Sequence, residues 1–306
     1  MASTDVKHKE SESEPGAPGT ASDQLAGLEA GLDALDTRAT QRTPIGRTLL
    51  SKAVPPLVAV TIVLVLWQLA YHFKVKEHYL LPSPVDVARV LRDKWLDGTL
   101  LDFVWTSLSR GAFGFLISLA IGTPLGLIIA RVKVVRAAIG PIMSGLQSLP
   151  SVAWVPAAII WFGLTDATIY AVILLGAVPS IANGLVAGVD QIQPLYLRAG
   201  RVVGARGFNA VRHILLPAAL PGYIAGLKQG WAFSWRSLMA AELIVKSGDL
   251  GVGLGQLLEQ GRELQDMAWV LAAILLILIV GIAVELLIFS PLERWVLRNR
   301  GLLVKN

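Results

Sequence analysis

The feature that most constrains this sequence is the apolar run MAWVLAAILLILIVGIAVELLIF at residues 267–289. A helix needs about 20 mainly apolar residues to cross the hydrocarbon layer of a membrane. Five further apolar segments precede this run, near 54–73, 104–130, 137–162, 167–188 and 217–245. The sequence therefore predicts an all-α, polytopic transmembrane helix bundle with about six spans.

The overall composition agrees with a membrane protein. Only 16% of the residues are charged, whereas soluble domains average about 25%. The absence of cysteine excludes disulfides, thiolate metal sites and cysteine nucleophiles. The four histidines have no metal-ligand spacing, so we expect neither a catalytic residue nor a metal site. We assign the net charge of +5 to cytoplasmic loops and predict no nucleic-acid binding.

The N-terminal stretch differs from the rest of the chain. Residues 1–44 are polar and rich in Pro, Gly and Ser, which predicts a disordered cytoplasmic tail. Leucines at 25, 28, 32 and 35 recur at helical spacing and leave a short amphipathic helix open. We expect a transmembrane domain at 45–295 and a short cytoplasmic tail at 296–306.

Prolines and small residues distinguish the middle of the chain. Pro141, Pro150, Pro156 and Pro179 interrupt the third and fourth apolar segments. Such breaks are tolerated where protein or water satisfies the freed carbonyl groups, and they indicate a bundle around a polar path. Glycine and alanine are dense in the second to fifth segments, which is typical of helices that pack closely in lipid.

The distribution of basic residues predicts the topology. Arginine and lysine concentrate before the first span, between spans two and three, between spans four and five, and after span six. The opposite loops carry fewer basic residues, mixed with many acids. Because basic loops stay in the cytoplasm, both termini are expected to be cytoplasmic.

The connection between the fourth and fifth segments is long and basic, reading PLYLRAGRVVGARGFNAVRHILLPAALPG from residue 194. Residues 195–203 predict a short helix that ends at Gly204, and residues 207–215 predict a second helix that ends at Pro217. Two interpretations remain open from the residues alone. The segment is either a lever that a cytoplasmic partner grips, or an inert amphipathic connector.

The spacing of this segment resembles the EAA loop of ATP-binding-cassette importer permeases, which is Glu-Ala-Ala, three residues, Gly, nine residues, Ile-x-Leu-Pro. Here Arg198 replaces the Glu and Gly200 replaces the second Ala. The resemblance implies a coupling loop at residues 195–217 that docks on the ATPase subunit. Its candidate residues are Arg198, Ala199, Gly200, Arg201, Gly204, Arg206, Ile214, Leu216 and Pro217.

The resemblance extends over roughly residues 60–295. The motifs that carry it are LPSP at 81–84, SLSR at 107–110, GTPLG at 122–126, LPSVAWVP at 149–156, AAELI at 240–244 and GVGLG at 251–255. They are similar to the nitrate, sulfonate, taurine and bicarbonate branch of these permeases, which have the type I importer fold. Leu250 and the glycines after it are expected to form a tight outer turn.

The resemblance also implies the setting in which the chain works. It implies a permease in the bacterial inner (plasma) membrane that translocates a small anion and works as a homodimer or with a second permease. Its other partners would be membrane lipid, two cytoplasmic ATP-binding subunits and an extracytoplasmic substrate-binding protein. No cofactor is expected on this chain, because the sequence has no Walker motif. ATP and Mg would bind to the partner ATPase.

Charged and aromatic residues within the spans are candidates for the translocation path, because intramembrane charges usually face the bundle interior. The candidates are Arg110, Trp154, Lys228, Trp231, Trp235, Arg236 and Glu242. Purely structural roles remain open for several of them. Glu242 could form a structural salt bridge with Arg110, Lys228 could lie near the cytoplasmic mouth, and Trp154 could belong to an interfacial belt.

Two other classes of membrane protein would be expected to show different sequence patterns. A gradient-driven secondary transporter would be expected to have two related halves with matching broken helices, and a channel falls in the same class. The sequence has no such symmetry. A membrane-embedded enzyme would need His, Asp or Glu clustered within the spans, and the spans lack them. The importer permease is therefore the function that the sequence favours.

Overall fold

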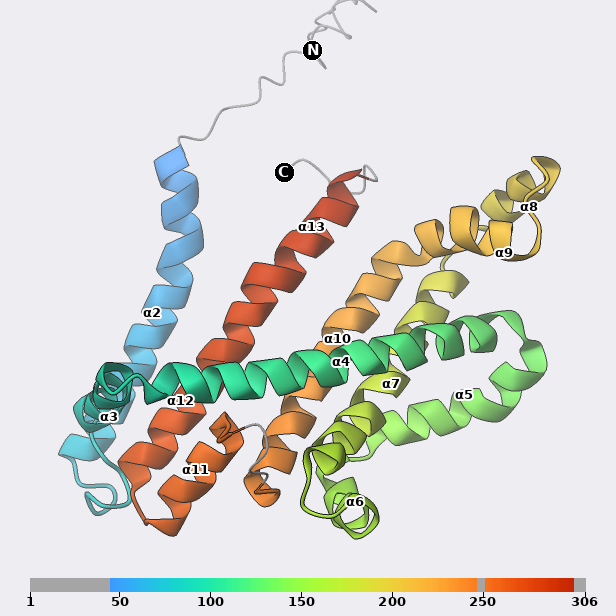
Figure 1. Cartoon of the computed structure of the whole chain (residues 1–306). Helices are drawn as coiled ribbons and strands as arrows, with labels where there is room; N and C mark the ends of the chain where they lie inside the picture. The colour runs from blue at the N-terminus through green and yellow to red at the C-terminus, as the bar shows by residue number, and fades with distance from the viewer. Residues whose placement is uncertain (1–44, 247–250, 300–306) are drawn as a thin grey trace, which may run out of the picture. The chain divides into compact units, whose positions relative to one another are not determined.

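The computed structural model describes residues 45–246 and 251–299 (Figure 1). The predicted N-terminal tail, its leucine repeat and residues 300–306 lie outside the described residues. Contacts divide the chain into two compact units at the Val63–Leu64 boundary, each described by itself. The described part of the first unit is the beginning of helix α2 (Ile45–His72), and everything below concerns the second unit.

Every regular element within the described residues is a helix, which confirms the predicted all-α class. The elements after α2 are α3 (Pro84–Leu96), α4 (Thr99–Arg131), α5 (Lys133–Ser148), η1 (Ser151–Trp154), α6 (Val155–Phe162), α7 (Asp166–Asp190), α8 (Pro194–Val202), α9 (Gly207–Ala210), η2 (Val211–Leu215), α10 (Leu216–Ile244), α11 (Leu254–Glu263), α12 (Met267–Val284), η3 (Glu285–Phe289) and α13 (Ser290–Asn299). Helix α13 thus continues beyond the predicted boundary at residue 295. Helix α11 was not predicted.

Four of the helical stretches are long and apolar enough to cross a membrane, and a bent fifth joins them if it is one span. The four are Val54–His72, Thr99–Arg131, Asp166–Asp190 and Met267–Asn299. The predicted segment near 217–245 forms α10, whose 29 residues are long enough but too polar to be counted. About six spans were predicted, and four or five are found among the described residues, so the predicted span count is approximately right; α10, with Lys228, Arg236 and Glu242, is the predicted segment that is not apolar enough.

The third predicted segment is a broken helix. Helix α5 ends at Ser148, and the chain turns by 99° before η1 and α6 continue. Pro150 lies in the break and Pro156 occupies the first turn of α6, where its missing N–H removes no helical hydrogen bond. Pro141 and Pro179 are instead accommodated inside α5 and α7. The prolines therefore predicted a break, and only the structure located it.

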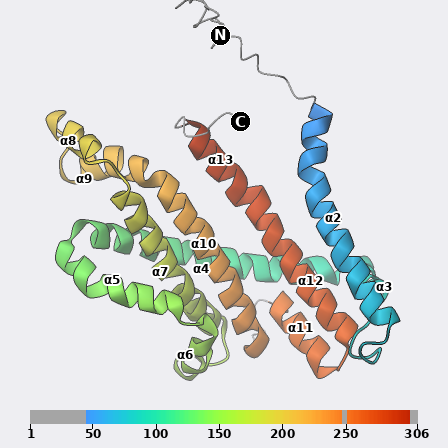
Figure 2. The same ribbon diagram turned by 180° about the vertical axis from the view of Figure 1, so that it is seen from behind.

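Helix α7 is the centre of the bundle. It packs along α4 on one side and α10 on the other (Figure 2), and it is the most deeply buried of the candidate spans. Glycines make the close approach possible: a Cβ on Gly222 of α10 would lie 2.6 Å from the Cα of Gly188 of α7, and one on Gly126 of α4 would lie 2.8 Å from the Cα of Ala182. Small residues serve helix packing here, as the sequence predicted.

The LPSP motif begins helix α3. Ser83 is the N-cap, Pro84 is in the first turn, and the Ser83 and Asp86 side chains form a capping box. The Ser83 hydroxyl donates a hydrogen bond of 2.7 Å to Asp86, which holds the pKa of that carboxyl below its usual value. The indole Nε1 of Trp67 donates to the Pro82 carbonyl and fixes the preceding turn. This motif is therefore structural.

Candidate coupling segment and buried charge network

Helices α8 and α9 lie at one end of α10, and α6 and α11 lie at the other (Figures 1 and 2). Both ends contain motifs that the sequence singled out. The first is the coupling segment, defined here as residues 194–217. The second is a buried charge network built by Ser107, Arg110, Asp166, Glu242 and the 251–256 turn.

The first half of the coupling segment folds as predicted. Helix α8 ends at Val202, and Gly204 follows with a φ of +83°. The Gly204 N–H donates to the Arg201 carbonyl at 3.1 Å, and the Ala205 N–H donates to the Gly200 carbonyl at 2.9 Å. These bonds form a Schellman motif with Gly204 in the left-handed position. The sequence prediction of a glycine turn at 204 is confirmed.

The second half corrects the prediction that a separate helix ends at Pro217. Helix α9 passes through the π-helical turn η2 directly into α10, and Pro217 lies in the first turn of α10. The Leu216 N–H bonds to the Val211 carbonyl across the wider turn. Because the helix runs on through this point, Pro217 lacks the N–H that would bond to the preceding turn, and the wider π-helical turn lies directly before it. The second half of the segment is consequently continuous with α10.

Two residues of the motif hold the halves together. Gly200 is buried on α8, and a Cβ built there would overlap the Cδ1 atom of Ile214 in η2. The isoleucine side chain thus occupies the space that an alanine methyl would take at 200. This contact gives a packing reason for the glycine that replaces the second alanine of the motif.

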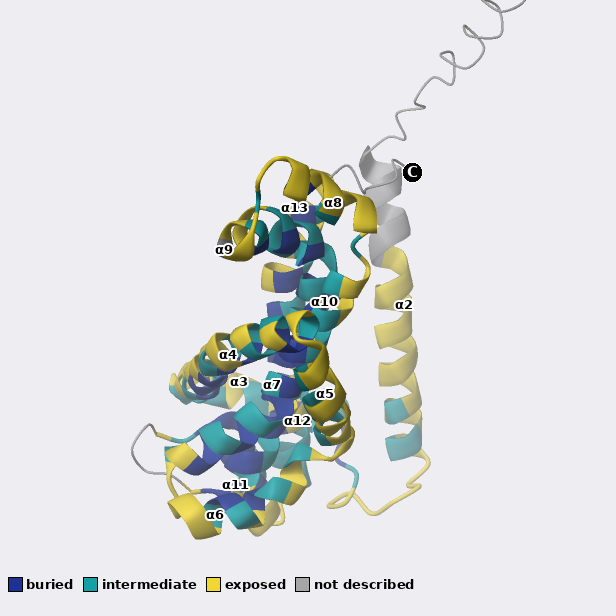
Figure 3. Cartoon of the chain, turned by 90° about the vertical axis from the view of Figure 1, so that its right-hand side faces the viewer, coloured by how far each residue is buried: buried dark blue, intermediate teal, exposed yellow. Residues whose placement is uncertain are grey.

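The outer face of the coupling segment is solvent-exposed (Figure 3). Arg198, Ala199, Arg201 and Arg206 are all exposed, while Leu216 and Pro217 are half-buried. Val202 and Val203 at the tip of α8 retain 89% and 85% of their accessible surface. Apolar side chains so exposed beside arginines are typical of an interaction surface.

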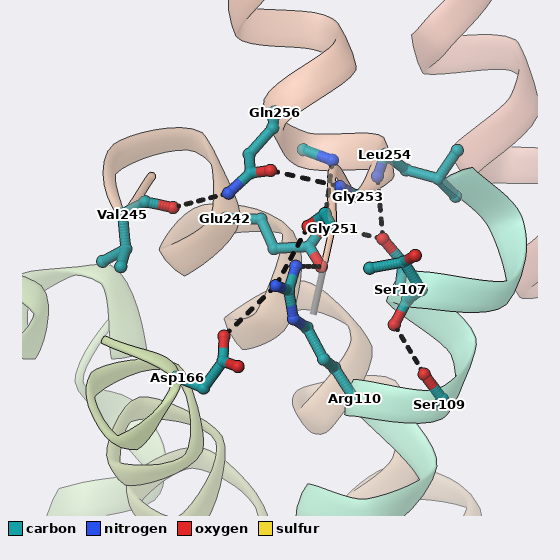
Figure 4. Close-up of polar contacts among 12 residues, drawn as sticks. Ser107, Ser109, Arg110, Asp166, Glu242, Val245, Gly251, Gly253, Leu254 and Gln256 are labelled. Atoms are coloured by element: carbon teal, nitrogen blue, oxygen red, sulfur yellow. Dashed lines mark hydrogen bonds and ion pairs between the residues drawn. The ribbon is translucent and has the colours of Figure 1, made fainter. Parts of the chain in front are cut away.

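At the opposite end, Arg110 of α4 and Glu242 of α10 form a fully buried ion pair with an Nη1–Oε1 distance of 3.2 Å (Figure 4). Ser107 donates a hydrogen bond of 2.7 Å to Glu242 Oε2, and the Gly255 N–H donates to the same oxygen at 3.0 Å. The carboxylate therefore has three donors, two from α4 and one from α11. The structural salt bridge that the sequence left open is present.

The glycine-rich turn at 251–255 closes over this pair. Arg110 Nη2 donates to the Gly251 carbonyl at 3.1 Å, and the Leu254 N–H donates to Ser107 Oγ at 2.8 Å. A Cβ on Gly253 would overlap the Glu242 carboxylate. Glycine is needed here because the backbone approaches a buried side chain, and the turn leads into α11.

Sequence reasoning missed Asp166. Its Oδ1 lies 3.2 Å from Arg110 Nη2, so one guanidinium faces two carboxylates. The residue is the first of α7, directly before the span that the apolar pattern placed at 167. An acidic residue in the first turn of a helix is favoured by the helix dipole. Its position at a predicted helix start therefore gave no reason to pair Asp166 with Arg110.

Comparison with known proteins identifies the family. The sequence model described as "binding-protein-dependent transport system inner membrane component" matches residues 122–297, more than half of the chain, including the coupling segment and all of the network except Ser107 and Arg110. The chain belongs to this family. It is a permease component of ATP-binding-cassette importers, and with its apolar helices it is a multi-pass membrane protein.

Relatives from this family cover most of the permease. It is 28% identical to the taurine transport system permease protein TauC of Escherichia coli, over 74% of this chain and 82% of that protein. It is 27% identical to the nitrate import permease protein NrtB of Synechocystis, over 80% and 90%. It is 29% identical to the bicarbonate transport system permease protein CmpB of Synechococcus elongatus, over 87% and 99%.

Among solved structures, an inward-facing form of the MetNI methionine ABC transporter matches with a TM-score of 0.56. The match covers 64% of this permease and 95% of the MetNI chain at 20% sequence identity. At that identity the likeness concerns the fold, and it agrees with the type I permease fold that the motifs implied.

The remaining path candidates of the permease lie in four different environments. Trp231 and Trp235 are buried and stacked, with ring centroids 6.1 Å apart. Lys228 lies 2.8 Å from both Glu285 and Glu293, and so joins α10 to η3 and α13. The tryptophan stack lies within α10, whereas the Lys228 ion pairs tie α10 to its neighbours.

Arg236 and Trp154 differ from that group. Arg236 is exposed on α10, with its guanidinium 4.5 Å from the ring centroid of Phe233 and with no carboxylate paired to it among the described residues. Trp154 ends η1 and is half-buried at the break between α5 and α6. The path candidates on α10 therefore do not share one common environment.

Proposed function

We propose that this permease is the membrane-spanning subunit of an ATP-driven importer for a small anion, with taurine or another sulfonate, nitrate and bicarbonate as the substrate class. The proposal rests on the family and on three relatives that are named as permeases for taurine, nitrate and bicarbonate. An extracytoplasmic binding protein would deliver the anion. The permease would work as a homodimer or with a second permease, and both termini would lie in the cytoplasm.

The observation that carries the mechanism is the continuity of the coupling segment with α10. Helix α8 is fastened to η2 through Gly200 and Ile214, and η2 runs without interruption into α10. A displacement of α8 by a partner would therefore move α10 as a rigid body. Exposed Arg198, Val202 and Val203 supply the surface that a cytoplasmic ATPase would contact.

In this proposal the permease itself performs no bond chemistry. ATP and Mg bind to two separate cytoplasmic subunits, whose closure is converted through residues 194–217 into a change of helix packing. Among the path candidates, Arg236 is the cation that we assign to the anion, because it is exposed and has no acidic partner among the described residues. Arg110 and Glu242 would support the path by fixing α4 against α10.

The test uses the permease reconstituted in lipid with its ATPase and with binding protein loaded with each candidate anion. Stimulation of ATP hydrolysis by one loaded binding protein would support the importer and identify the anion. Gly204→Val should abolish the stimulation, because a β-branched residue does not tolerate a φ of +83°. Membrane insertion should persist.

Gly98→Val is the matched control for this variant. Gly98 also has a positive φ, +74°, and open space around it, but it precedes α4 and lies outside the coupling segment. It should lose comparable stability and retain stimulated hydrolysis. Stimulation that survives in Gly204→Val would rule out the coupling role of the segment.

A further inference from the structure

A second site adjoins the coupling segment. A cavity of about 570 Å³ lies between the end of α4, helix α8 and the α9–η2 turn. Three arginines line it, one from each part: Arg131 ends α4, Arg201 belongs to α8, and Arg206 precedes α9. The cavity is in the size range of small-ligand sites, about 300–1,000 Å³.

The charge of the cavity is unbalanced. None of its lining side chains is acidic within the described part of the chain, and none of the three arginines takes part in an ion pair there. The lining also includes the apolar side chains of Leu197, Val211 and Leu215. Guanidinium groups bind phosphate oxygens in bidentate fashion, so the chemistry favours a phosphate on an otherwise apolar ligand.

The position of Arg131 indicates where that ligand comes from. Arg131 is the last residue of the candidate span Thr99–Arg131, so the cavity adjoins the end of a helix that is apolar enough to cross a membrane. Ile128, one turn earlier on α4, is 48% exposed and apolar. An acyl chain could lie along that side of α4 while its phosphate reaches the arginines. Basic pockets at the end of spans are typical sites for anionic headgroups.

We propose that this cavity binds the phosphate of an acidic phospholipid, with Arg131, Arg201 and Arg206 as its ligands. The bound lipid bridges α4 to the coupling segment, because the three arginines come from both. The site is thus a lipid contact of defined position, beyond the general solvation of the spans. It requires no ATPase and does not depend on the transported anion.

Native mass spectrometry of the purified permease, without its ATPase, tests the site. Phosphatidylglycerol and phosphatidylcholine of matched acyl chains are compared on the wild type and on Arg131→Gln/Arg206→Gln. Each guanidinium near a membrane surface strengthens binding of an anionic lipid about fivefold. The double variant should therefore lose about 25-fold in phosphatidylglycerol binding, with phosphatidylcholine binding unchanged.

Arg212→Gln is the matched control, because Arg212 is exposed on the same segment and does not line the cavity. Equal phosphatidylglycerol binding in the wild type and the double variant would overturn the proposal. So would displacement of the lipid by millimolar inorganic phosphate alone, which would indicate a free-anion site. A double variant that binds lipid normally but no longer assembles with the ATPase would assign the arginines to the protein partner instead.

This experiment separates the lipid site from the importer function. Lipid binding is read on the permease alone, whereas coupling is read as ATP hydrolysis in the full complex. A permease that couples normally and lacks lipid selectivity would refute the site only.

Discussion

The coupling segment and the buried charge network use the same residue types in opposite ways. In the network, Arg110 is fully buried and faces Glu242, Asp166 and the Gly251 carbonyl. In the coupling segment, Arg198, Arg201 and Arg206 are exposed and have no ion pair within the described residues. A buried charge must be paired because its desolvation is expensive, whereas an exposed arginine remains available to a partner.

Glycine shows the same contrast. Gly253 permits the backbone to approach the Glu242 carboxylate, with an ordinary φ of −98°. Gly204 has open space around it and a φ of +83°. The first glycine is required for space and the second for backbone conformation. The comparison therefore predicts that damage to the network lowers stability and spares coupling, while damage to the coupling segment abolishes coupling.

The largest effect is expected from Arg110→Met. The variant leaves Glu242 buried without its cation, which costs about 3–5 kcal/mol. The midpoint of thermal unfolding in detergent and the yield of folded protein should both fall. The double variant Arg110→Met/Glu242→Gln should recover part of the loss, because it removes the orphaned charge.

Arg89→Met provides the reference for that measurement. Arg89 pairs with Asp86 at 2.9 Å on the surface of α3, where an ion pair contributes about 0–1 kcal/mol. Unfolding midpoints that fall equally in the Arg110 and Arg89 variants would contradict the distinction between buried and exposed pairs.

A smaller effect with a sharper contrast is expected from Gly253→Ala and Gly204→Ala. In Gly253→Ala the new methyl displaces the Glu242 carboxylate, at a cost of about 1–3 kcal/mol. Hydrolysis per folded complex should remain coupled to the binding protein. In Gly204→Ala the left-handed residue is strained by about 1–2 kcal/mol, and coupling should fail. Parallel unfolding and ATPase measurements check both, and the same pattern of loss in the two variants would contradict the comparison.

The smallest effect is expected from Gly200→Ala, which restores the usual alanine of the motif. Alanine gains about 1 kcal/mol of helix propensity over glycine. The Ile214 side chain must move, at a cost of about 0.5–1.5 kcal/mol for an off-rotamer conformation. Net stability should hardly change.

Ile214→Val removes the Cδ1 atom that overlaps the new methyl. In that background Gly200→Ala should stabilise the protein by several tenths of a kcal/mol or more, measured as a rise in the unfolding midpoint. A loss of stability in both backgrounds would show that the Gly200–Ile214 contact does not limit this position.

The sequence predicted local features such as turns well, and it predicted contacts between distant residues poorly. The turn at Gly204 was predictable because a left-handed C-terminal residue is a local property, readable from a glycine after an amphipathic repeat. The end of the second helix at Pro217 was predicted wrongly. Proline reads as a stop signal, and in the structure it lies in the first turn of α10 after a π-helical turn.

The candidate site shows the same limit. Arg110 and Glu242 could be named as possible partners because both are costly within a span. Asp166 could not, because its approach to Arg110 depends on the depth at which α7 begins relative to α4. Lys228 was expected near a path or a mouth; its pairing with Glu285 and Glu293, from a helix that follows much later in the chain, could not be predicted from the sequence.

The sequence by itself determined that this chain is a helical membrane protein. It also determined that residues 194–217 form an arginine-rich segment with a turn at a glycine. Apolar length, glycine placement and motif spacing are properties of consecutive residues. Only the tertiary structure decided which charges are neutralised in the bundle and which remain exposed. That choice depends on how α4, α7 and α10 are rotated about their axes and shifted along them relative to one another. The close glycine contacts between these helices set that arrangement.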